Sequence, residues 1–182
     1  MLGCRPPPTA ARRKPQAMKI YFLRHAEAED GANDAERELT AKGGEQSRLM
    51  GQLLAALGVE FDRAFTSPLV RARQTEEIVL AQLPGRKKTV IEETDHLLNE
   101  ASDTSVAQWL AGLKKADAVL LVGHMPSLGL HLARLLGIRQ APAVSLPKGA
   151  LAVIAWEPSS LAELKLFITP KQAGKLLRRA AP

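Results

Sequence analysis

The chain has 182 residues, the length of one domain, and a hydrophobic content of 46% that is sufficient to form a core. No apolar run approaches the roughly 20 residues of a membrane-spanning helix, so we expect no membrane partner. The net charge of +6 comes from the two ends, because residues 1–17 and 171–182 each carry four basic and no acidic residues. The remaining chain is mildly acidic and aromatic residues are only 4% of the total, which argues against nucleic acid as a partner.

The two ends differ in character from the chain between them. Residues 1–17 are rich in Pro and Arg and lack the apolar segment of a secretory signal, so we expect a disordered extension before a native start at Met18. Residues 18–170 form the expected single domain, and residues 171–182 form a basic tail. The lone Cys4 excludes an intramolecular disulfide bond, which is typical of a reducing compartment. We therefore expect a cytoplasmic protein, and we expect it to be a monomer.

The domain begins with an apolar segment, residues 20–23, that is followed directly by Arg24 and His25. Four apolar residues between polar ones are typical of a strand that is buried on both faces of a parallel sheet. Such a strand places its last residues at the carboxyl edge of the sheet, where open α/β sheets bind ligands. An isolated Arg-His pair is more often part of an ordinary surface loop, so its interpretation depends on the rest of the chain.

The next segment alternates between helix and strand. A polar loop, residues 27–38, precedes a helix that Thr40 caps and that ends near Gly58. A short strand then covers residues 61–66. Ser67-Pro68 follows it and predicts a second helix, with Ser67 as the N-cap and Pro68 at the first helical position.

The remaining chain continues this alternation. Its expected elements are a strand, a helix, a strand, a helix and two antiparallel strands, at residues 89–92, 106–113, 117–123, 126–136, 150–156 and 161–168. Strands that alternate with helices indicate βαβ units. The sequence thus predicts a three-layer α/β/α fold, with a mostly parallel sheet and helices on both faces.

Two of the buried strands end in histidine, at His25 and His124. Because right-handed βαβ units bring the carboxyl ends of parallel strands to one edge, we expect these two imidazoles to converge. Arg24 accompanies the first histidine, and Arg71 lies in the first turn of the helix after the second strand. Two arginines, two histidines and a helix N-terminus favour an anion site, and a phosphoryl group suits it because Arg binds its oxygens bidentately.

The motifs at these positions also form a recognisable set. They are Leu23-Arg24-His25-Ala26, Leu39-Thr40-Ala41-Lys42-Gly43, Ser67-Pro68 through Thr75, and Gly123-His124-Met125-Pro126. Taken together, they resemble the histidine phosphatase superfamily, also called phosphoglycerate mutase-like. The short chain and the pattern Ser-Pro-x-x-Arg-Ala-x-Gln-Thr are most similar to the SixA-type phosphohistidine phosphatases, and the resemblance covers residues 18–170.

The resemblance implies a role for each of the four residues. His25 would be the nucleophile that takes the phosphoryl group on one ring nitrogen, while a hydrogen bond to the other nitrogen fixes its tautomer. Arg24, Arg71 and His124 would neutralise the phosphoryl oxygens. The family needs neither metal nor cofactor, and the sequence shows no carboxylate cluster with metal-ligand spacing.

The sequence does not single out a general acid. Larger relatives use a carboxylate after the third strand, where this chain offers Glu93, Asp95, Glu100 and Asp103. We take Glu100 as the candidate, with a solvated loop charge as the alternative. A phosphohistidine that is protonated on its distal nitrogen leaves as neutral imidazole and needs no acid, whereas an alkoxide leaving group does need one.

Three functions follow from these residues. The first is a phosphatase for phosphohistidine in a signalling protein, such as a histidine phosphotransfer domain. The second is a phosphatase of small phosphate esters, and the third is a non-catalytic phosphate-binding or scaffold protein. Outside the four residues, we expect His131 on a helix face, His96 in an exposed loop and Arg73 in solvent or at the rim of the site.

Overall fold

The computed structural model describes residues 17–84, 89–101, 103–113, 116–139, 144–158 and 160–180. The expected disordered extension, with Cys4, lies outside the described residues except for Ala17. The elements are β1 (Met18–Arg24), the 3-10 helix η1 (Asp34–Glu36), α1 (Ala41–Ala56), β2 (Arg63–Thr66), α2 (Val70–Ala81), β3 (Val90–Glu93), the 3-10 helix η3 (Asp95–Leu97), α3 (Asp103–Gly112), β4 (Ala118–Gly123), α4 (Ser127–Leu135), β5 (Leu151–Trp156), β6 (Glu163–Ile168) and α5 (Pro170–Ala180).

The strands form one mixed sheet in the order β3-β2-β4-β1-β5-β6. The first four of these are parallel, while β5 is antiparallel to β1 and β6 is antiparallel to β5. The predicted mostly parallel sheet with a final antiparallel hairpin is therefore confirmed. Within the sheet, Arg24 is paired with Gly123 and Thr66 with Val122, so β1, β4 and β2 end at the same level. This register brings the residues after the three strands to one edge.

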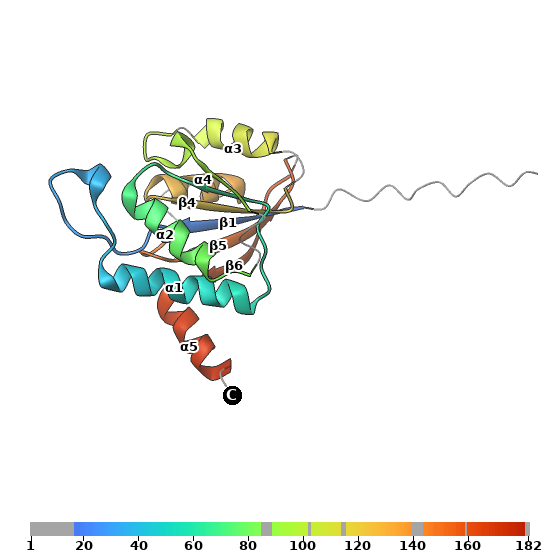
Figure 1. Cartoon of the computed structure of the whole chain (residues 1–182). Helices are drawn as coiled ribbons and strands as arrows, with labels where there is room; N and C mark the ends of the chain where they lie inside the picture. Colours follow the sequence, from blue (N-terminus) through green and yellow to red (C-terminus); the bar gives the residue numbers. More distant parts are fainter. Residues whose placement is uncertain are drawn as a thin grey trace, which may run out of the picture.

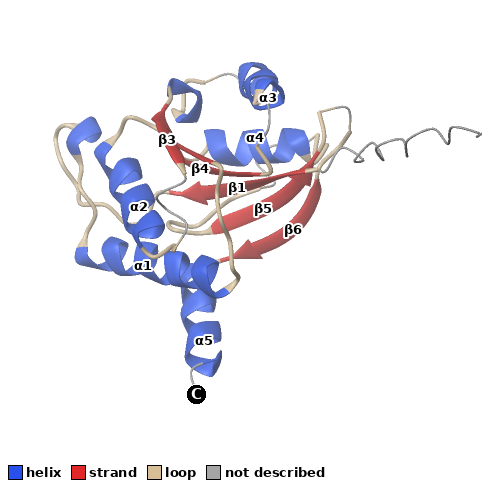
Figure 2. Cartoon of the chain, turned by 45° about the vertical axis from the view of Figure 1, so that its right-hand side comes forward, coloured by secondary structure: helices blue, strands red, loops and turns tan. Residues whose placement is uncertain are grey.

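Helices cover both faces of the sheet (Figures 1 and 2). On one face, a cluster of buried residues joins alternate strand residues such as Ile20 and Phe22 to α3 and α4. On the other face, a second cluster joins Tyr21 and Leu23 to α1, α2 and α5. Successive side chains of a strand point to opposite faces, which explains why a continuous apolar strand serves both clusters. The three-layer α/β/α prediction is confirmed.

The start of α1 fixes the loop that follows His25. The side chain of Thr40 accepts a hydrogen bond from the Gly43 amide at 2.9 Å, as predicted for an N-cap. A Cβ atom at Gly43 would lie 1.9 Å from the carbonyl oxygen of Glu27. Glycine at this position thus permits the backbone of the His25 loop to pass directly over the first turn of α1.

The start of α2 differs from the prediction. The helix begins at Val70 with Leu69 as its N-cap, and no side chain caps it. Ser67 was expected in the capping role, but it lies before the helix at the end of β2. Its hydroxyl contacts a histidine instead of the helix amides. The local preference of Ser67 to cap the helix is thus overridden by its contact with His124, which lies 57 positions further along the chain.

The basic tail is mostly helical. The helix α5 buries Pro170, Ala173 and Gly174, and it packs beside α1 on one face of the sheet. Its free end projects away from the body of the molecule (Figure 1). Among the helices of the described segments, none has the length and apolar character needed to cross a membrane.

Candidate active site

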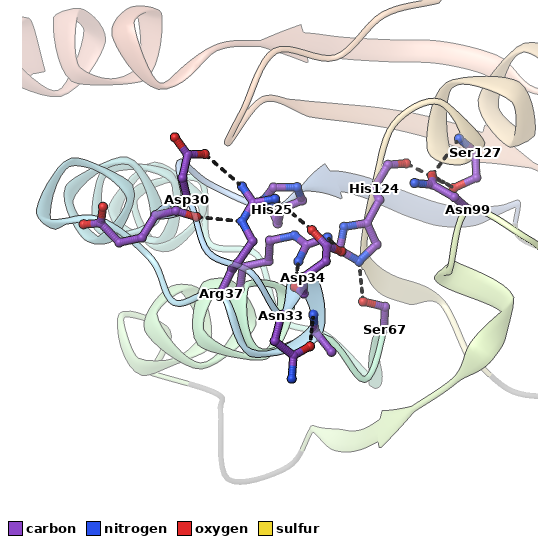
Figure 3. Close-up of polar contacts among 12 residues, drawn as sticks. His25, Asp30, Asn33, Asp34, Arg37, Ser67, Asn99, His124 and Ser127 are labelled. Atoms are coloured by element: carbon purple, nitrogen blue, oxygen red, sulfur yellow. Dashed lines mark hydrogen bonds and ion pairs between the residues drawn. The ribbon is translucent and has the colours of Figure 1, made fainter.

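Four of the five predicted site residues, Arg24, His25, Arg71 and His124, lie near one another at the carboxyl edge of the sheet, and Figure 3 shows His25 beside His124. The amide of His25 donates to the carbonyl oxygen of Gly123 at 3.0 Å, and the amide of Ser67 donates to that of Val122 at 3.1 Å. These bonds continue the sheet pairing beyond the last strand residues, so they hold the backbone at the edge. The rings of His25 and His124 lie 4.9 Å apart, measured between their centroids.

The His25 ring is held in one tautomer. Its Nδ1 atom lies 2.7 Å from the carbonyl oxygen of Ala26, and because a carbonyl can only accept, Nδ1 carries the proton. The lone pair of a neutral ring is then on Nε2. Burial is the main cause that lowers the pKa of His25 to about 3, with His124 and the two arginines as further causes. His25 is therefore uncharged at neutral pH and presents a nucleophilic nitrogen.

His124 is buried even more completely, with 2% of its surface exposed. Its Nε2 atom lies 2.6 Å from the hydroxyl oxygen of Ser67, and its Nδ1 atom is buried without a hydrogen-bond partner among the described residues. Burial, followed by the positive charge of Arg71, lowers the pKa of His124 to about 4. This ring is also neutral at physiological pH.

The two arginines approach from different elements. Arg24, the last residue of β1, donates from Nη1 to the carbonyl oxygen of Leu146 at 2.8 Å, and its buried Nε has no partner in the described residues. Burial lowers its pKa. Arg71 is 6% exposed and lies in the first turn of α2, as the sequence predicted. The structure thus brings Arg24, His25, Arg71 and His124 to one edge of the sheet.

Asp34 is a member of the site that the sequence did not indicate. It lies in η1, within the polar loop after β1. Its backbone oxygen accepts from Nη1 of Arg71 at 2.6 Å, and its Oδ2 atom accepts from Nη2 at 2.9 Å. Its Oδ1 atom accepts from Arg37 at 2.8 Å. Hydrogen bonds from these two arginines lower the pKa of Asp34, so the carboxylate is ionised.

Ser67 is the second residue whose place in the site was missed. It is completely buried, and its hydroxyl contacts His124 rather than the α2 amides. The Ser-Pro motif predicts a helix N-cap, because serine before a helix most often accepts hydrogen bonds from the first helical amides. Only the position of Ser67 at a strand end, next to the strand that ends at His124, could have indicated the contact.

The candidate general acid, Glu100, lies in the segment between η3 and α3. It is exposed, and with Glu93, Asp95 and His96 it lines a surface cavity of about 790 Å³. The described lining of that cavity includes none of the four residues that converge at the edge. The side chain of Asp103 lies outside the described residues. The structure therefore gives Glu100 no contact with His25 that would support a role as the acid.

The remaining candidates have ordinary structural roles. His131 is a residue of α4, as expected, and it is buried. His96 is half-buried and stacks on Trp109 at 5.0 Å, which differs from the exposed position that we expected. Arg73 is largely exposed and pairs with Glu93 at 3.4 Å. Within the described segments, no three His, Cys, Asp or Glu side chains are grouped to hold a metal ion.

Comparisons with known proteins agree with this geometry. Residues 20–103 match the model of the histidine phosphatase superfamily (branch 1). An uncharacterized protein of Picosynechococcus sp. is 34% identical over 170 residues, which cover 85% of this chain and 98% of the relative. Phosphohistidine phosphatase SixA of Escherichia coli is 34% identical over 124 residues, which cover 65% of this chain and 74% of SixA.

The fold is shared with solved structures as well. The structure of the protein histidine phosphatase SixA complexed with tungstate matches with a TM-score of 0.75 at 28% sequence identity. The match covers 85% of this chain and 98% of the SixA chain.

Proposed function

The chain belongs to the histidine phosphatase superfamily, and we propose that it removes the phosphoryl group from phosphohistidine in a signalling protein such as a histidine phosphotransfer domain. The observation that carries the proposal is the state of His25. Its Nδ1–H donates a hydrogen bond to the carbonyl oxygen of Ala26. The lone pair on Nε2 is therefore available, near two arginines and a second histidine.

The reaction follows from this arrangement in two steps. In the first, Nε2 of His25 forms a bond to phosphorus while the phosphorus–nitrogen bond of the substrate breaks. The electron pair of that bond returns to the substrate imidazole, which leaves as a neutral ring if its distal nitrogen is protonated. In the second step, water attacks phosphorus and the bond to Nε2 breaks. Inorganic phosphate leaves with the oxygen and both protons of the water, as H2PO4−, and the electron pair of the broken bond returns to Nε2, so His25 regains its neutral form with the proton on Nδ1.

The surrounding residues would stabilise charge on the phosphoryl oxygens. The unpartnered Nε of Arg24 and the N–H groups of Arg71 are donors, and so is the buried Nδ1 of His124 if it carries the proton. Donors that are fixed before the reaction lower the barrier because no reorganisation is needed as charge develops. Burial of these groups strengthens each interaction by excluding water.

The absence of a proton donor among the described contacts of His25 supports phosphohistidine over phosphate esters. Glu100 lines a cavity whose described residues include none of the four site residues, and Asp34 is held ionised by two arginines. An ester would leave as an alkoxide and would need a proton from such a group. A protonated phosphohistidine needs none. The likeness to SixA, which is named a phosphohistidine phosphatase, favours the same substrate class.

The test is a comparison of substrates. Phosphate release is measured from a histidine-phosphorylated phosphotransfer domain, from para-nitrophenyl phosphate and from common sugar phosphates, in buffer that contains a metal chelator. We expect fast release from the phosphoprotein, little from the sugar phosphates, and none from the phosphoprotein with the His25→Ala variant. Faster release from a sugar phosphate would contradict the proposal and favour the small-ester function. No release from any substrate would favour the non-catalytic function.

A further inference from the structure

Both residues of the contact between Ser67 and His124 are buried. Ser67 is 0% exposed and His124 is 2% exposed, so water cannot replace either partner. The serine backbone is fixed by a hydrogen bond from its amide N–H to the carbonyl oxygen of Val122 at 3.1 Å, which continues the sheet pairing. The hydroxyl of Ser67 is thereby directed at Nε2 of His124, at 2.6 Å (Figure 3).

A serine hydroxyl can either donate to an imidazole nitrogen or accept from it. If Ser67 donates, Nε2 holds the lone pair and the proton of the neutral ring is on Nδ1. If Ser67 accepts, the proton is on Nε2 and Nδ1 holds a lone pair. The two tautomers thus present opposite groups at Nδ1, and the distance of 2.6 Å is compatible with both.

The position of Nδ1 decides between them. This atom is buried without a partner among the described residues, and Figure 3 shows it on the side of the ring that faces His25 and Asp34. A phosphoryl group bound to His25 would bring its oxygens to this side. These oxygens are acceptors, so a lone pair at Nδ1 would repel them, whereas an N–H group would bind them.

We propose that Ser67 is a positioning residue, whose hydroxyl donates to Nε2 of His124 and so keeps the proton on Nδ1, where it can bind the phosphoryl group. The inference rests on the proposed function, because it assigns a donor to the same phosphoryl site. It explains how His124 acts while uncharged. A neutral imidazole donates at Nδ1 only when Nε2 is unprotonated, and a donor that faces Nε2 stabilises that tautomer.

Two variants test the proposal. Ser67→Ala removes the donor to Nε2, while Thr66→Val removes a neighbouring buried hydroxyl that contacts the backbone of Ser67 instead of His124. We expect Ser67→Ala to lower kcat for phosphohistidine by roughly ten- to a hundredfold, the range found for groups that orient metal-bound histidines. We expect KM to change little, Ser67→Thr to restore part of the rate, and Thr66→Val to stay near the wild-type rate.

A spectroscopic measurement separates this role from a merely structural one. In wild-type protein labelled with 15N at histidine, Nδ1 of His124 should give the shift of a protonated nitrogen and Nε2 that of an unprotonated one. In Ser67→Ala, we expect the proton to move to Nε2 or to be shared between the two nitrogens. A protonated Nε2 in the wild type, or an unchanged tautomer together with an unchanged kcat in Ser67→Ala, would overturn the proposal.

The two readouts also separate this inference from the proposed function. The tautomer is measured in the free protein, so it requires no substrate. If the wild type releases no phosphate from any substrate, the proposed function fails. If the wild type is active on phosphohistidine but Ser67→Ala keeps both its rate and the wild-type tautomer, only the role of Ser67 fails.

Discussion

Arg71 donates two hydrogen bonds to Asp34, one to the backbone oxygen at 2.6 Å and one to Oδ2 at 2.9 Å. The carboxylate therefore occupies donors of an arginine that the proposed mechanism uses for the phosphoryl oxygens. Two anions cannot use the same N–H groups at once. Asp34 must move or share Arg71 when a phosphoryl group binds, and its side chain is exposed enough to do so, at 63%.

Removal of this carboxylate should strengthen anion binding. We expect Asp34→Ala to bind inorganic phosphate several-fold more tightly than the wild type, because Arg71 no longer carries a competing anion. Isothermal titration with phosphate measures the change. Glu36→Ala is the matched control, since Glu36 lies in the same 3-10 helix and carries the same charge. Weaker phosphate binding in Asp34→Ala alone would indicate that Asp34 holds Arg71 in its active position instead.

The two arginines of α2 should behave differently. Arg71 is buried at the sheet edge, and Arg73 is an exposed residue that pairs with Glu93. We expect Arg71→Ala to lower kcat/KM by on the order of 10²–10³-fold, as for the loss of one oxyanion donor. We expect Arg73→Ala to remain near the wild-type value, because exposed ion pairs contribute little. Similar losses in both variants would show that the helix, rather than the guanidinium of Arg71, is required.

The two histidines should make the fold sensitive to acid. Their pKa values in the folded protein, about 3 for His25 and about 4 for His124, lie below the value of about 6.5 in an unfolded chain. Between pH 6.5 and 4 the unfolded state thus binds more protons than the folded state, so the free energy of unfolding must fall as the pH is lowered. The contribution of the two histidines is fully present above pH 6.5.

Chemical denaturation at several pH values measures this effect. In the double variant His25→Ala/His124→Ala, we expect the unfolding free energy to depend less on pH between 6.5 and 4 than in the wild type. An equal pH dependence in both proteins would show that the histidines have ordinary pKa values when folded. In that case the account of His25 as a permanently neutral nucleophile would also be wrong.

Glu100 should be dispensable for phosphohistidine. It is exposed and lines a cavity whose described residues exclude His25, Arg71 and His124. We expect Glu100→Gln to release phosphate from a phosphorylated phosphotransfer domain at the wild-type rate. The variant keeps the shape of the side chain and removes only the charge and the acid. A large loss of rate would restore Glu100 as the general acid and would require that the loop moves toward the site.

The sequence was sufficient to place the four residues at one edge of the sheet, because each of them lies at the end or the start of an element. Arg24 and His25 follow one buried strand, and His124 follows another. Parallel packing then brings strand ends together without any further information. Arg71 was located in the same way, from the helix that follows β2. These predictions needed only the order and type of the elements.

The order and type of the elements could not predict that Asp34 and Ser67 belong to the site. Asp34 lies in a polar loop whose path depends on tertiary contacts, and its partner Arg71 is 37 residues further along the chain. Ser67 has a strong local preference for capping a helix, which the contact with His124 overrides. Glu100 was selected from a segment that follows β3, but the sequence holds no information on which way that loop turns.

A trapping experiment shows directly whether His25 carries the phosphoryl group during the reaction. The wild-type protein is mixed with a histidine-phosphorylated phosphotransfer domain and quenched in base within milliseconds, and the site of phosphorylation is identified by mass spectrometry. We expect a phosphoryl group on His25, with the phosphoenzyme appearing before inorganic phosphate is released. Arg73→Ala should trap the same intermediate, whereas His25→Ala should trap none and release no phosphate. Phosphate release at the wild-type rate by His25→Ala would rule out His25 as the nucleophile.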